Sequence, residues 1–360
     1  MTDEPRPATY ADSGVDIGAG ERAVELMRPW VEKASRPEVI GGIGGFAGLF
    51  ELDLSRWRHP VLASSTDGVG TKLVIAQQLG RHDTIGLDLV GMVVDDVVVC
   101  GAEPLFLQDY IACGRVVPER MAEIIGGIAR GCAQVGCALV GGETAEHPGL
   151  LEPDEYDIAG TAVGAVDRDA LLGPVRVRVG DVVIAMGSSG LHSNGYSLVR
   201  HTLLGSAGRM PLDAIPEDLD TDRTLGEELL TPTRIYARDC LLLVAECEVH
   251  AFAHITGGGL AANLSRSLPV GLDAVVDRGS WRPAPVFELI AGRGRIEAEE
   301  MERTFNMGVG MIAVVAAQDA DRALAVLMGR KMPAWVAGEV AAGRDVDGGG
   351  VARLTGRYAR

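Results

Sequence analysis

An apolar run that ends in an acid, two glycines and a lysine most restricts how this chain can fold. Residues 60–63 are predicted to form a buried strand, and Asp-Gly-Val-Gly-Thr-Lys follows at 67–72. Glycine lets a backbone approach a ligand closely. Asp67 is able to hold a hard cation, and Lys72 is able to meet phosphate oxygens as a point charge. The segment therefore indicates either a phosphate site after a strand or a glycine turn with solvated charges.

The composition favours two domains of the α/β (α+β) class. The chain has 360 residues, which is enough for two domains of ordinary size. Its hydrophobic content of 47%, its 48 glycines and its aromatic content of 4% are typical of aliphatic strands and helices joined by tight turns. Gly173-Pro174 is the best candidate for a boundary. We therefore predict domains at 1–172 and 173–360.

The charge and the cysteines limit the partners and the compartment. A formal net charge of −17 argues against nucleic acid or an acidic membrane as the main partner. The cysteines form no C-x-x-C pair, so reduced, buried thiols are favoured over a metal site. The N-terminus shows no basic-then-apolar signal, and no apolar stretch reaches the roughly 20 residues that span a bilayer. We expect a soluble cytoplasmic protein.

Apolar spacing predicts the elements that carry the conspicuous segments. Strands are expected at 105–112, 138–140, 156–166, 181–186 and 311–315. Helices are expected at 88–100, 118–135, 195–204 and 231–246, and another is expected to begin at 260. Pro118 suits the first position of a helix, and Thr231-Pro232 resembles an N-cap followed by proline.

Two adjacent carboxylates, Asp95 and Asp96, interrupt an apolar helical stretch. Burying carboxylates is costly unless a cation or hydrogen-bond donors meet them. Together with Asp67 and Asp88 they could hold one or two Mg²⁺ ions, with nucleotide phosphates completing the coordination. The alternative is that both acids lie on the solvated stripe of a surface helix.

Two glycine-rich runs are candidate ligand loops. The run at 40–48 is too rich in glycine for the interior of a helix or strand. It matches G-x-G-x-x-A, but two other segments also match, so the pattern does not establish a Rossmann fold. The run at 141–144 follows the expected strand at 138–140, at the end where open α/β sheets bind ligands. Its Glu143 is either a further ligand or an acidic loop residue.

The run at 187–196 joins an expected strand to an expected helix. Ser193 or Asn194 can cap that helix, whose free N–H groups and dipole favour an anion such as phosphate. His192 could donate to a phosphoryl group or transfer a proton, although many loop histidines are only hydrogen-bonded surface groups. Residues 256–259 offer a similar nest of N–H groups. Two anion sites would suit a substrate that itself carries a phosphate.

Several common motifs are absent from the sequence. It contains no G-x-x-x-x-G-K-[ST] loop, protein-kinase signature set, G-x-S-x-G elbow or H-E-x-x-H pair. ATP use by the common P-loop route is therefore excluded. The residues by themselves indicate a phosphate-handling, Mg²⁺-using α/β enzyme whose product they do not name.

The motifs occur in an order that resembles a known family. The matching segments are Tyr10 with 14–17, 36–39 with the glycine loop, 65–73, 81–86, 101–104, 139–146, 187–196, 230–236, 254–259 and 303–311. In this combination they resemble the phosphoribosylformylglycinamidine cyclo-ligase family, also called aminoimidazole ribonucleotide synthetases. The resemblance covers most of the chain, and a series of motifs in order is far more specific than any one of them.

The resemblance implies an ATP-dependent ring closure in purine biosynthesis. Formylglycinamidine ribonucleotide and ATP would give aminoimidazole ribonucleotide, ADP and phosphate. ATP would phosphorylate the formyl oxygen, the amidine nitrogen would attack that carbon, and phosphate would leave. Mg²⁺ would offset charge on the transferring phosphoryl group. The family's fold is two α/β domains, with the N-terminal domains pairing in a homodimer through a sheet or barrel.

The resemblance also implies roles for particular residues. ATP would be bound by Gly42, Gly44, Gly45, Asp67, Gly68, Lys72, Asp88, Asp96, Gly142 and Glu143. The metal would be held by Asp67, Asp95, Asp96 and Glu143. The ribonucleotide would be held by His192, Ser193, Asn194, Gly195, Thr256, Gly257 and Gly258. Lys72 and His192 would take part in the chemistry.

Two departures and two alternatives accompany the resemblance. Met307 stands where many relatives have a small thiol. Apolar spacing also predicts a helix at 21–33, and Pro29 interrupts it, which weakens the prediction that Arg28 contacts the nucleotide. Another ATP-using member of the same superfamily would share the acidic half. A non-catalytic nucleotide-binding dimer is the alternative from a different class, although the presence of Lys72 together with the acids argues against it.

Overall fold

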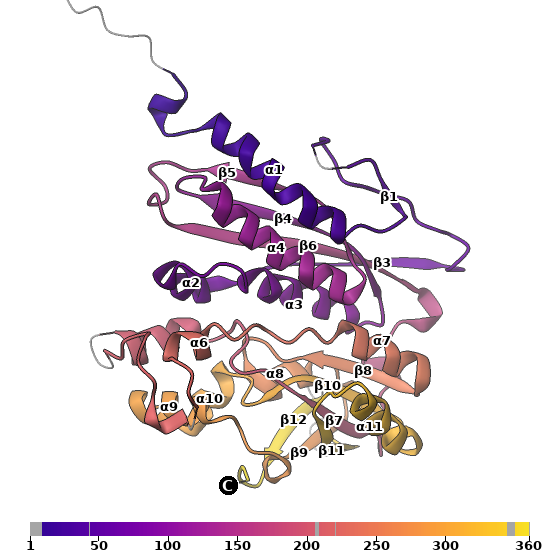
Figure 1. Cartoon of the computed structure of the whole chain (residues 1–360). Helices are drawn as coiled ribbons and strands as arrows, with labels where there is room; N and C mark the ends of the chain where they lie inside the picture. The colour runs from indigo at the N-terminus through magenta and orange to yellow at the C-terminus, as the bar shows by residue number, and fades with distance from the viewer. Residues whose placement is uncertain (1–8, 43, 206–208, 220, 344–349, 360) are drawn as a thin grey trace, which may run out of the picture.

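Two mixed sheets, one in each half of the chain, form the framework of the protein (Figure 1). We describe a computed structural model of the chain in residues 9–42, 44–205, 209–219, 221–343 and 350–359. Ile43 of the predicted glycine loop lies outside these described residues. The α/β class expected from composition is confirmed.

The first sheet has the strand order β3-β6-β4-β5. Its strands are β3 (Pro60–Gly68), β4 (Glu103–Cys113), β5 (Ala138–Glu146) and β6 (Tyr156–Asp167). Strands β4 and β5 run parallel, and β6 pairs antiparallel with both β3 and β4. One face is covered by α1 (Ile17–Lys33), α3 (Ile85–Val98) and α4 (Pro118–Val135). The other face carries exposed side chains, among them Leu62 and Tyr110.

The second sheet has the strand order β12-β9-β11-β7-β10-β8. Its strands are β7 (Val182–Gly187), β8 (Val249–His254), β9 (Leu272–Asp277), β10 (Val309–Val315), β11 (Ala334–Ala342) and β12 (Val351–Thr355). Helices α7 (Ala237–Glu246), α8 (Gly259–Ser265) and α11 (Ala320–Gly329) pack against it. The short helices α5 (Tyr196–Val199), α6 (Leu225–Leu229), α9 (Pro285–Gly294) and α10 (Ala298–Thr304) complete this half.

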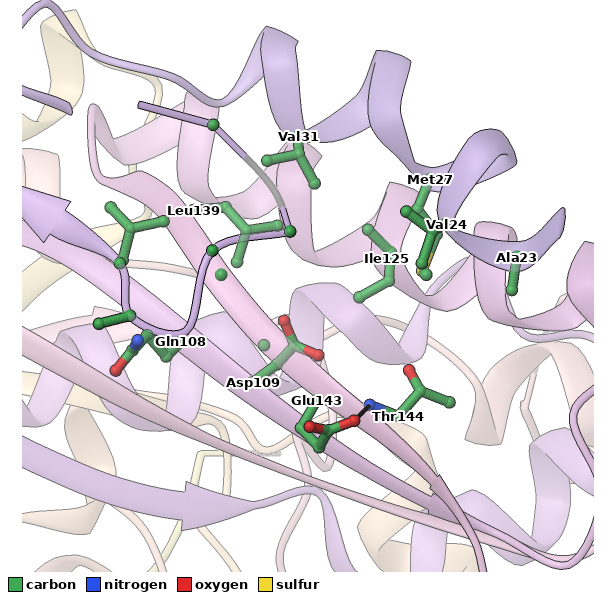
Figure 2. A pocket seen from close by; sticks show the side chains of 18 of the residues that line it. Ala23, Val24, Met27, Val31, Gln108, Asp109, Ile125, Leu139, Glu143 and Thr144 are labelled. Atoms are coloured by element: carbon green, nitrogen blue, oxygen red, sulfur yellow. Dashed lines mark hydrogen bonds between the residues drawn. The ribbon is translucent and has the colours of Figure 1, made fainter. Parts of the chain in front are cut away.

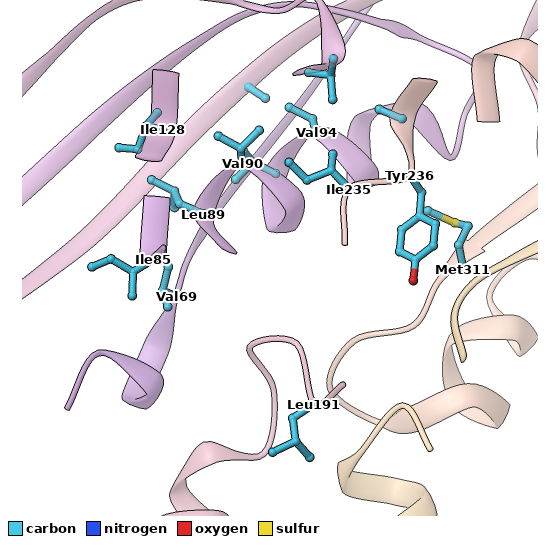
Figure 3. Close-up of a cluster of buried hydrophobic side chains, with 14 of the residues drawn as sticks. Val69, Ile85, Leu89, Val90, Val94, Ile128, Leu191, Ile235, Tyr236 and Met311 are labelled. Atoms are coloured by element: carbon cyan, nitrogen blue, oxygen red, sulfur yellow. The ribbon is translucent and has the colours of Figure 1, made fainter. Parts of the chain in front are cut away.

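Helix α3 lies between the two halves and joins their cores. Of its 14 residues, all but two are buried, because β3 and β6 cover one side and α4 and α7 cover others. Figure 3 shows Leu89, Val90 and Val94 of this helix in one apolar cluster with Ile235 and Met311 of the second half. The α2 helix (Leu73–Leu79) also lies on the side of the first sheet that faces the second half (Figure 1).

Three local predictions differ from the structure. The segment at 60–63 belongs to a longer strand that is only half buried, because one face of the first sheet is open. Residues 141–144 lie within β5 and do not follow it. Residues 231–236 are not helical, and α7 begins at Ala237. The backbone N–H groups of Thr233 and Tyr236 donate to carboxylates of α3, which holds this segment in a non-helical conformation.

Candidate functional site

Lys72 is the centre of a buried polar network between the two halves. Its Nζ donates to Asp88 Oδ1 at 2.8 Å and to the backbone carbonyls of Thr231 at 2.7 Å and His192 at 3.1 Å. Asp88 Oδ1 also accepts the backbone N–H and the hydroxyl of Thr233. An ammonium group has three protons, so these contacts use the whole donor capacity of Lys72.

Two of the residues predicted to contact ATP belong to this network. The side chains of Lys72 and Asp88 are both fully buried and paired with each other. Burial lowers the pKa of Lys72, while the neighbouring Asp88 carboxylate acts in the opposite direction and favours the charged form. The predicted contacts of Lys72 and Asp88 with ATP therefore stay predictions. Lys72 fixes the backbone of the His192 loop, and Asp88 fixes the segment that contains Thr233.

Asp95 forms a second link from α3 to the other half. Both of its oxygens accept the backbone N–H of Tyr236, at 2.9 and 3.1 Å, and the Tyr236 hydroxyl donates to the Gly187 carbonyl at 2.9 Å. Asp95 is fully buried, and burial raises its pKa to about 7. In this geometry the Asp95 carboxylate faces a backbone N–H in the core, and its predicted role as a metal ligand stays a prediction.

His192 occupies a strained and buried position. Its φ of 62° lies in the left-handed region, and the contact of its carbonyl with Lys72 helps to hold that conformation. Its Nε2 accepts the backbone N–H of Ser189 at 3.2 Å, while Nδ1 has no partner within the described chain. Burial, with help from the charges of His254 and Lys72, lowers the pKa of His192 well below its usual value. The imidazole is neutral at physiological pH.

Asp96 and His254 form a charged pair across the two halves. His254 Nδ1 lies 2.8 Å from Asp96 Oδ1, and Ser65 of β3 donates to Asp96 Oδ2 at 3.3 Å. Burial opposes the charge of His254, but the bond to Asp96 and the charges of Asp95, Asp96 and Asp67 outweigh it, so the pKa of His254 is raised. The Asp96 side chain stays 43% exposed, which leaves it accessible to a ligand.

The predicted ribonucleotide residues lie close to this pair. His254 directly precedes the segment that carries Thr256, Gly257 and Gly258. A Cβ added to Gly257 would stand 3.5 Å from Asn194 Oδ1, so the two predicted anion loops are neighbours. Gly195 has a φ of 80° at the start of α5, which only glycine adopts readily.

Ser193 and Asn263 hold these two loops in place. The Ser193 hydroxyl lies 3.2 Å from that of Thr233, which ties the first loop to the segment held by Asp88. The amide of Asn263 donates to the carbonyls of Thr256, Gly257 and Gly259, and the Gly259 N–H donates to the Thr256 carbonyl, so these contacts fix the turn of the second loop. The structure therefore brings His192, Ser193, Asn194, Gly195, Thr256, Gly257 and Gly258 into one region.

A separate cavity of about 610 Å³ lies at the β5 edge of the first sheet. Five of the predicted ATP-binding residues line it: Gly42, Gly44, Gly45, Gly142 and Glu143. Figure 2 shows the apolar side chains of α1 and α4 on one side and the strands β4 and β5 on the other. The residues predicted to bind ATP thus divide between this cavity and the region around Asp96.

Asp109 lies in the cavity and was not predicted as a site residue. It is only 7% exposed, and burial raises its pKa to about 7. The signal was present in the sequence: Leu107, Asp109 and Ile111 alternate along the expected strand, which places an acid on the face of an apolar stripe.

The register of the first sheet relates Asp67 to the cavity. Asp67 of β3 pairs with Gly160 of β6, Gly160 pairs with Asp109 of β4, and Asp109 pairs with Gly142 of β5. Neighbouring strands lie about 4.8 Å apart, so three spacings separate Asp67 from Gly142 by roughly 14 Å.

The expected cluster of four metal ligands is not assembled. Within the described ranges, no group of three or more His, Cys, Asp or Glu side chains is placed to hold a metal ion. Asp67 and Asp96 both lie near His254, whereas Glu143 lies at the far edge of the sheet. The carboxylates of Asp67 and Asp96 suit Mg²⁺ only when phosphate oxygens and water supply the remaining ligands.

Comparisons with known proteins cover nearly the whole chain. Family models described as AIR synthase related protein match residues 53–166 with the N-terminal domain and 178–350 with the C-terminal domain. The chain is 54% identical over 335 residues to a phosphoribosylformylglycinamidine cyclo-ligase of Anaeromyxobacter sp. (strain K), which covers 93% of this chain and 96% of that protein. It is 51% identical to a protein of the same name from Geobacillus kaustophilus (strain HTA426), over 95% and 98% of the two chains.

Solved structures show the same fold at low identity. Thiamine-monophosphate kinase from Stenotrophomonas maltophilia K279a aligns with a TM-score of 0.63 at 20% identity, over 94% of this chain and 97% of that one. Hydrogenase maturation protein HypE in complex with ATP aligns with a TM-score of 0.63 at 20% identity, over 95% and 92%. These similarities support the two-domain α/β architecture.

Proposed function

Because the chain belongs to the AIR synthase related family, together with phosphoribosylformylglycinamidine cyclo-ligases, we propose that it catalyses the same ring closure. The enzyme converts formylglycinamidine ribonucleotide and ATP into aminoimidazole ribonucleotide, ADP and phosphate, a step of purine biosynthesis. The observation that carries the proposal is the high identity to curated cyclo-ligases over 93% of the chain.

In this proposal ATP lies across the strands of the first sheet, from β5 toward β3. The base enters the cavity lined by Gly42, Gly44 and Gly142, and the phosphates extend toward Asp67 and Asp96. Three strand spacings, roughly 14 Å, separate the two ends, a distance that suits a nucleoside triphosphate. Asp67 and Asp96 would hold Mg²⁺ together with phosphate oxygens, and the ion would offset charge on the γ-phosphoryl group.

The ribonucleotide occupies the loops of the second half. Backbone N–H groups at Gly257 and Gly258, with Ser193 and Asn194, bind its phosphate, since N–H nests of this kind favour anions. ATP phosphorylates the formyl oxygen. The amidine nitrogen then attacks the formyl carbon, the C–O bond breaks, and phosphate leaves with that oxygen.

His192 is the candidate side chain for the chemistry of the closure. Its imidazole is neutral, and because Nε2 accepts the N–H of Ser189, the ring proton is on Nδ1, which has no partner within the described chain and can donate a hydrogen bond to the transferred phosphoryl group. Replacement of His192 by alanine tests this role: turnover at saturating substrate should fall by about 10²-fold or more. Unchanged turnover would remove His192 from the chemistry.

The open face of the first sheet supports a homodimer. Leu62 of β3 is 62% exposed and Tyr110 of β4 is 43% exposed on this face. A partner sheet would cover this surface. Six free cysteines support a reducing compartment such as the cytoplasm, and within the described ranges no helix combines the length and apolar character needed to cross a bilayer.

The direct test of the proposed function is product formation. The purified chain is mixed with formylglycinamidine ribonucleotide, MgCl₂ and ATP, and the product is measured as a diazotisable aromatic amine. We expect amine in proportion to ADP, and none when ATP is omitted. ADP release without amine would indicate a different ATP-using reaction and would overturn the proposal.

A further inference from the structure

Asp109 is a buried carboxyl group that no other side chain satisfies. It is 7% exposed, and within the described chain the hydrogen bond to its carboxylate comes from its own backbone N–H. Its oxygens are not among the fully enclosed unpaired atoms of the described chain, and Asp109 lines the cavity, so a ligand there can meet its carboxyl group. Neither the proposed chemistry nor the network around Lys72 uses this group.

The surroundings of Asp109 leave room for a flat apolar ligand. A Cβ at Gly142 would lie 2.4 Å from Asp109 Oδ1, so glycine is required there to keep the space beside the carboxyl open. Figure 2 shows Asp109 directed into the cavity, with Val24 and Met27 of α1 and Ile125 of α4 lining it. Apolar walls with a few convergent polar groups are typical of a small-molecule or cofactor pocket.

We propose that Asp109 reads the hydrogen-bonding edge of the nucleotide base and selects adenine over guanine. This inference rests on the proposed function, because it assumes that the cavity holds the base of ATP. Asp109 thereby becomes a specificity-determining residue for the nucleotide.

The protonation state of the carboxyl sets which base it fits. A protonated carboxyl offers one donor and one acceptor, which match the N1 acceptor and the exocyclic amine of adenine. An ionised carboxylate offers acceptors alone, which match the N1–H and the exocyclic amine of guanine. Burial raises the pKa of Asp109 to about 7, so the protonated form is well populated at neutral pH.

The groups that face Asp109 do not oppose the protonated form of its carboxyl group. From α4 the buried Cys132 thiol faces it, and the Asp109 charge contributes to the raised pKa of that thiol. From β5, Glu143 is the other acid on the cavity lining. From β6 the opposite residue is Gly160, and α1 contributes apolar residues and glycine. Among the described residues that line the cavity there is no lysine, arginine or histidine to hold the carboxylate ionised.

The test is the binding of ATP and GTP to the full chain by calorimetry between pH 6 and pH 8.5. For the unmodified chain we expect a preference for ATP that weakens as the pH rises through about 7. Asp109→Ala should weaken ATP binding about tenfold or more, since it removes two hydrogen bonds worth roughly 1.4 kcal/mol or more together. Asp109→Asn should keep the ATP preference at every pH, because an amide also offers one donor and one acceptor.

Two features of the experiment keep the outcomes distinct. Asp157→Asn, on β6 of the same sheet but absent from the cavity lining, is the matched control and should leave both affinities unchanged. The near-isosteric Asp109→Asn decides the question if Asp109→Ala does not fold. The inference is overturned if Asp109→Asn keeps the pH dependence of the unmodified chain, or if folded Asp109→Ala keeps its ATP-to-GTP ratio. Binding is measured without turnover, so failure to form the amine product would remove the proposed function and leave this result intact.

Discussion

Replacement of Lys72 by methionine distinguishes two possible roles of this residue: a contact with nucleotide phosphate, and a structural ion pair with Asp88. Methionine has a similar length but no charge, so the variant leaves Asp88 without its ion-pair partner in a fully buried position. It also removes the donor to the carbonyls of His192 and Thr231. Breaking a buried ion pair by removal of one partner costs about 3–5 kcal/mol. Asp88 keeps two hydrogen bonds from Thr233, so we expect a loss near the lower end, about 3 kcal/mol.

The free energy of unfolding in urea measures this loss, followed by tryptophan fluorescence and by far-UV circular dichroism. The double variant Lys72→Met with Asp88→Asn should recover part of the lost stability, because the unpaired charge is then absent. Arg115→Met, which removes a surface partner of Asp154, is the control and should change stability by about 1 kcal/mol or less. If Lys72→Met keeps its stability but binds ATP much more weakly, Lys72 contacts the nucleotide and the structural role is refuted.

Three further predictions follow from the interface and the open sheet. Burial raises the pKa of Asp95 from 3.8 to about 7, so ionisation of Asp95 lowers the free energy of unfolding as the pH rises through that window. In urea unfolding at pH 8, Asp95→Asn should therefore be more stable than the unmodified chain by roughly 2–4 kcal/mol. A stability difference between the two proteins that is no larger at pH 8 than at pH 4 would contradict this. Because the pKa of His254 is raised in the folded protein, the stabilisation by protonated His254 is complete below pH 6.5 and is lost as the pH rises through the pKa of the folded state. The free energy of unfolding of His254→Gln should therefore depend less on pH between 6 and 9 than that of the unmodified chain. The same pH dependence in both proteins would exclude the pair of His254 with Asp96 as the cause. Leu62→Glu places a charge on the open sheet face and should convert a dimer to a monomer in light scattering, whereas a variant that remains dimeric would place the interface elsewhere.

The sequence predicts elements well where the pattern is local. Pro118 and the 3.6-residue period after it predict α4, and the structure has the helix at Pro118–Val135. The prediction at 231–246 failed at its start because Thr233 and Tyr236 bond to Asp88 and Asp95, which are more than 140 positions away. No local signal reports such contacts.

The same distinction applies to the site. Charged residues within apolar runs, such as Asp95, indicate that polar partners meet them in the fold. The role of each charged residue depends on which partners these are, and the sequence does not show them. The sequence predicts ligand contacts for Lys72 and Asp95, and it could not show that backbone groups of Thr231 and Tyr236 in the second half form hydrogen bonds with them. The glycines at 141–142 resembled a loop, whereas Gly142 lies in a strand and leaves space for Asp109. Asp109 itself was detectable from the alternation along β4.

Transfer of oxygen from substrate to phosphate tests the central claim most directly. The chain is given formylglycinamidine ribonucleotide that carries ¹⁸O in the formyl group, with MgCl₂ and unlabelled ATP, and the released phosphate is analysed by mass spectrometry. ATP-dependent closure through a phosphorylated formyl oxygen predicts one ¹⁸O atom in each phosphate formed. Phosphate that contains only unlabelled oxygen, released while the ring closes, would contradict the account.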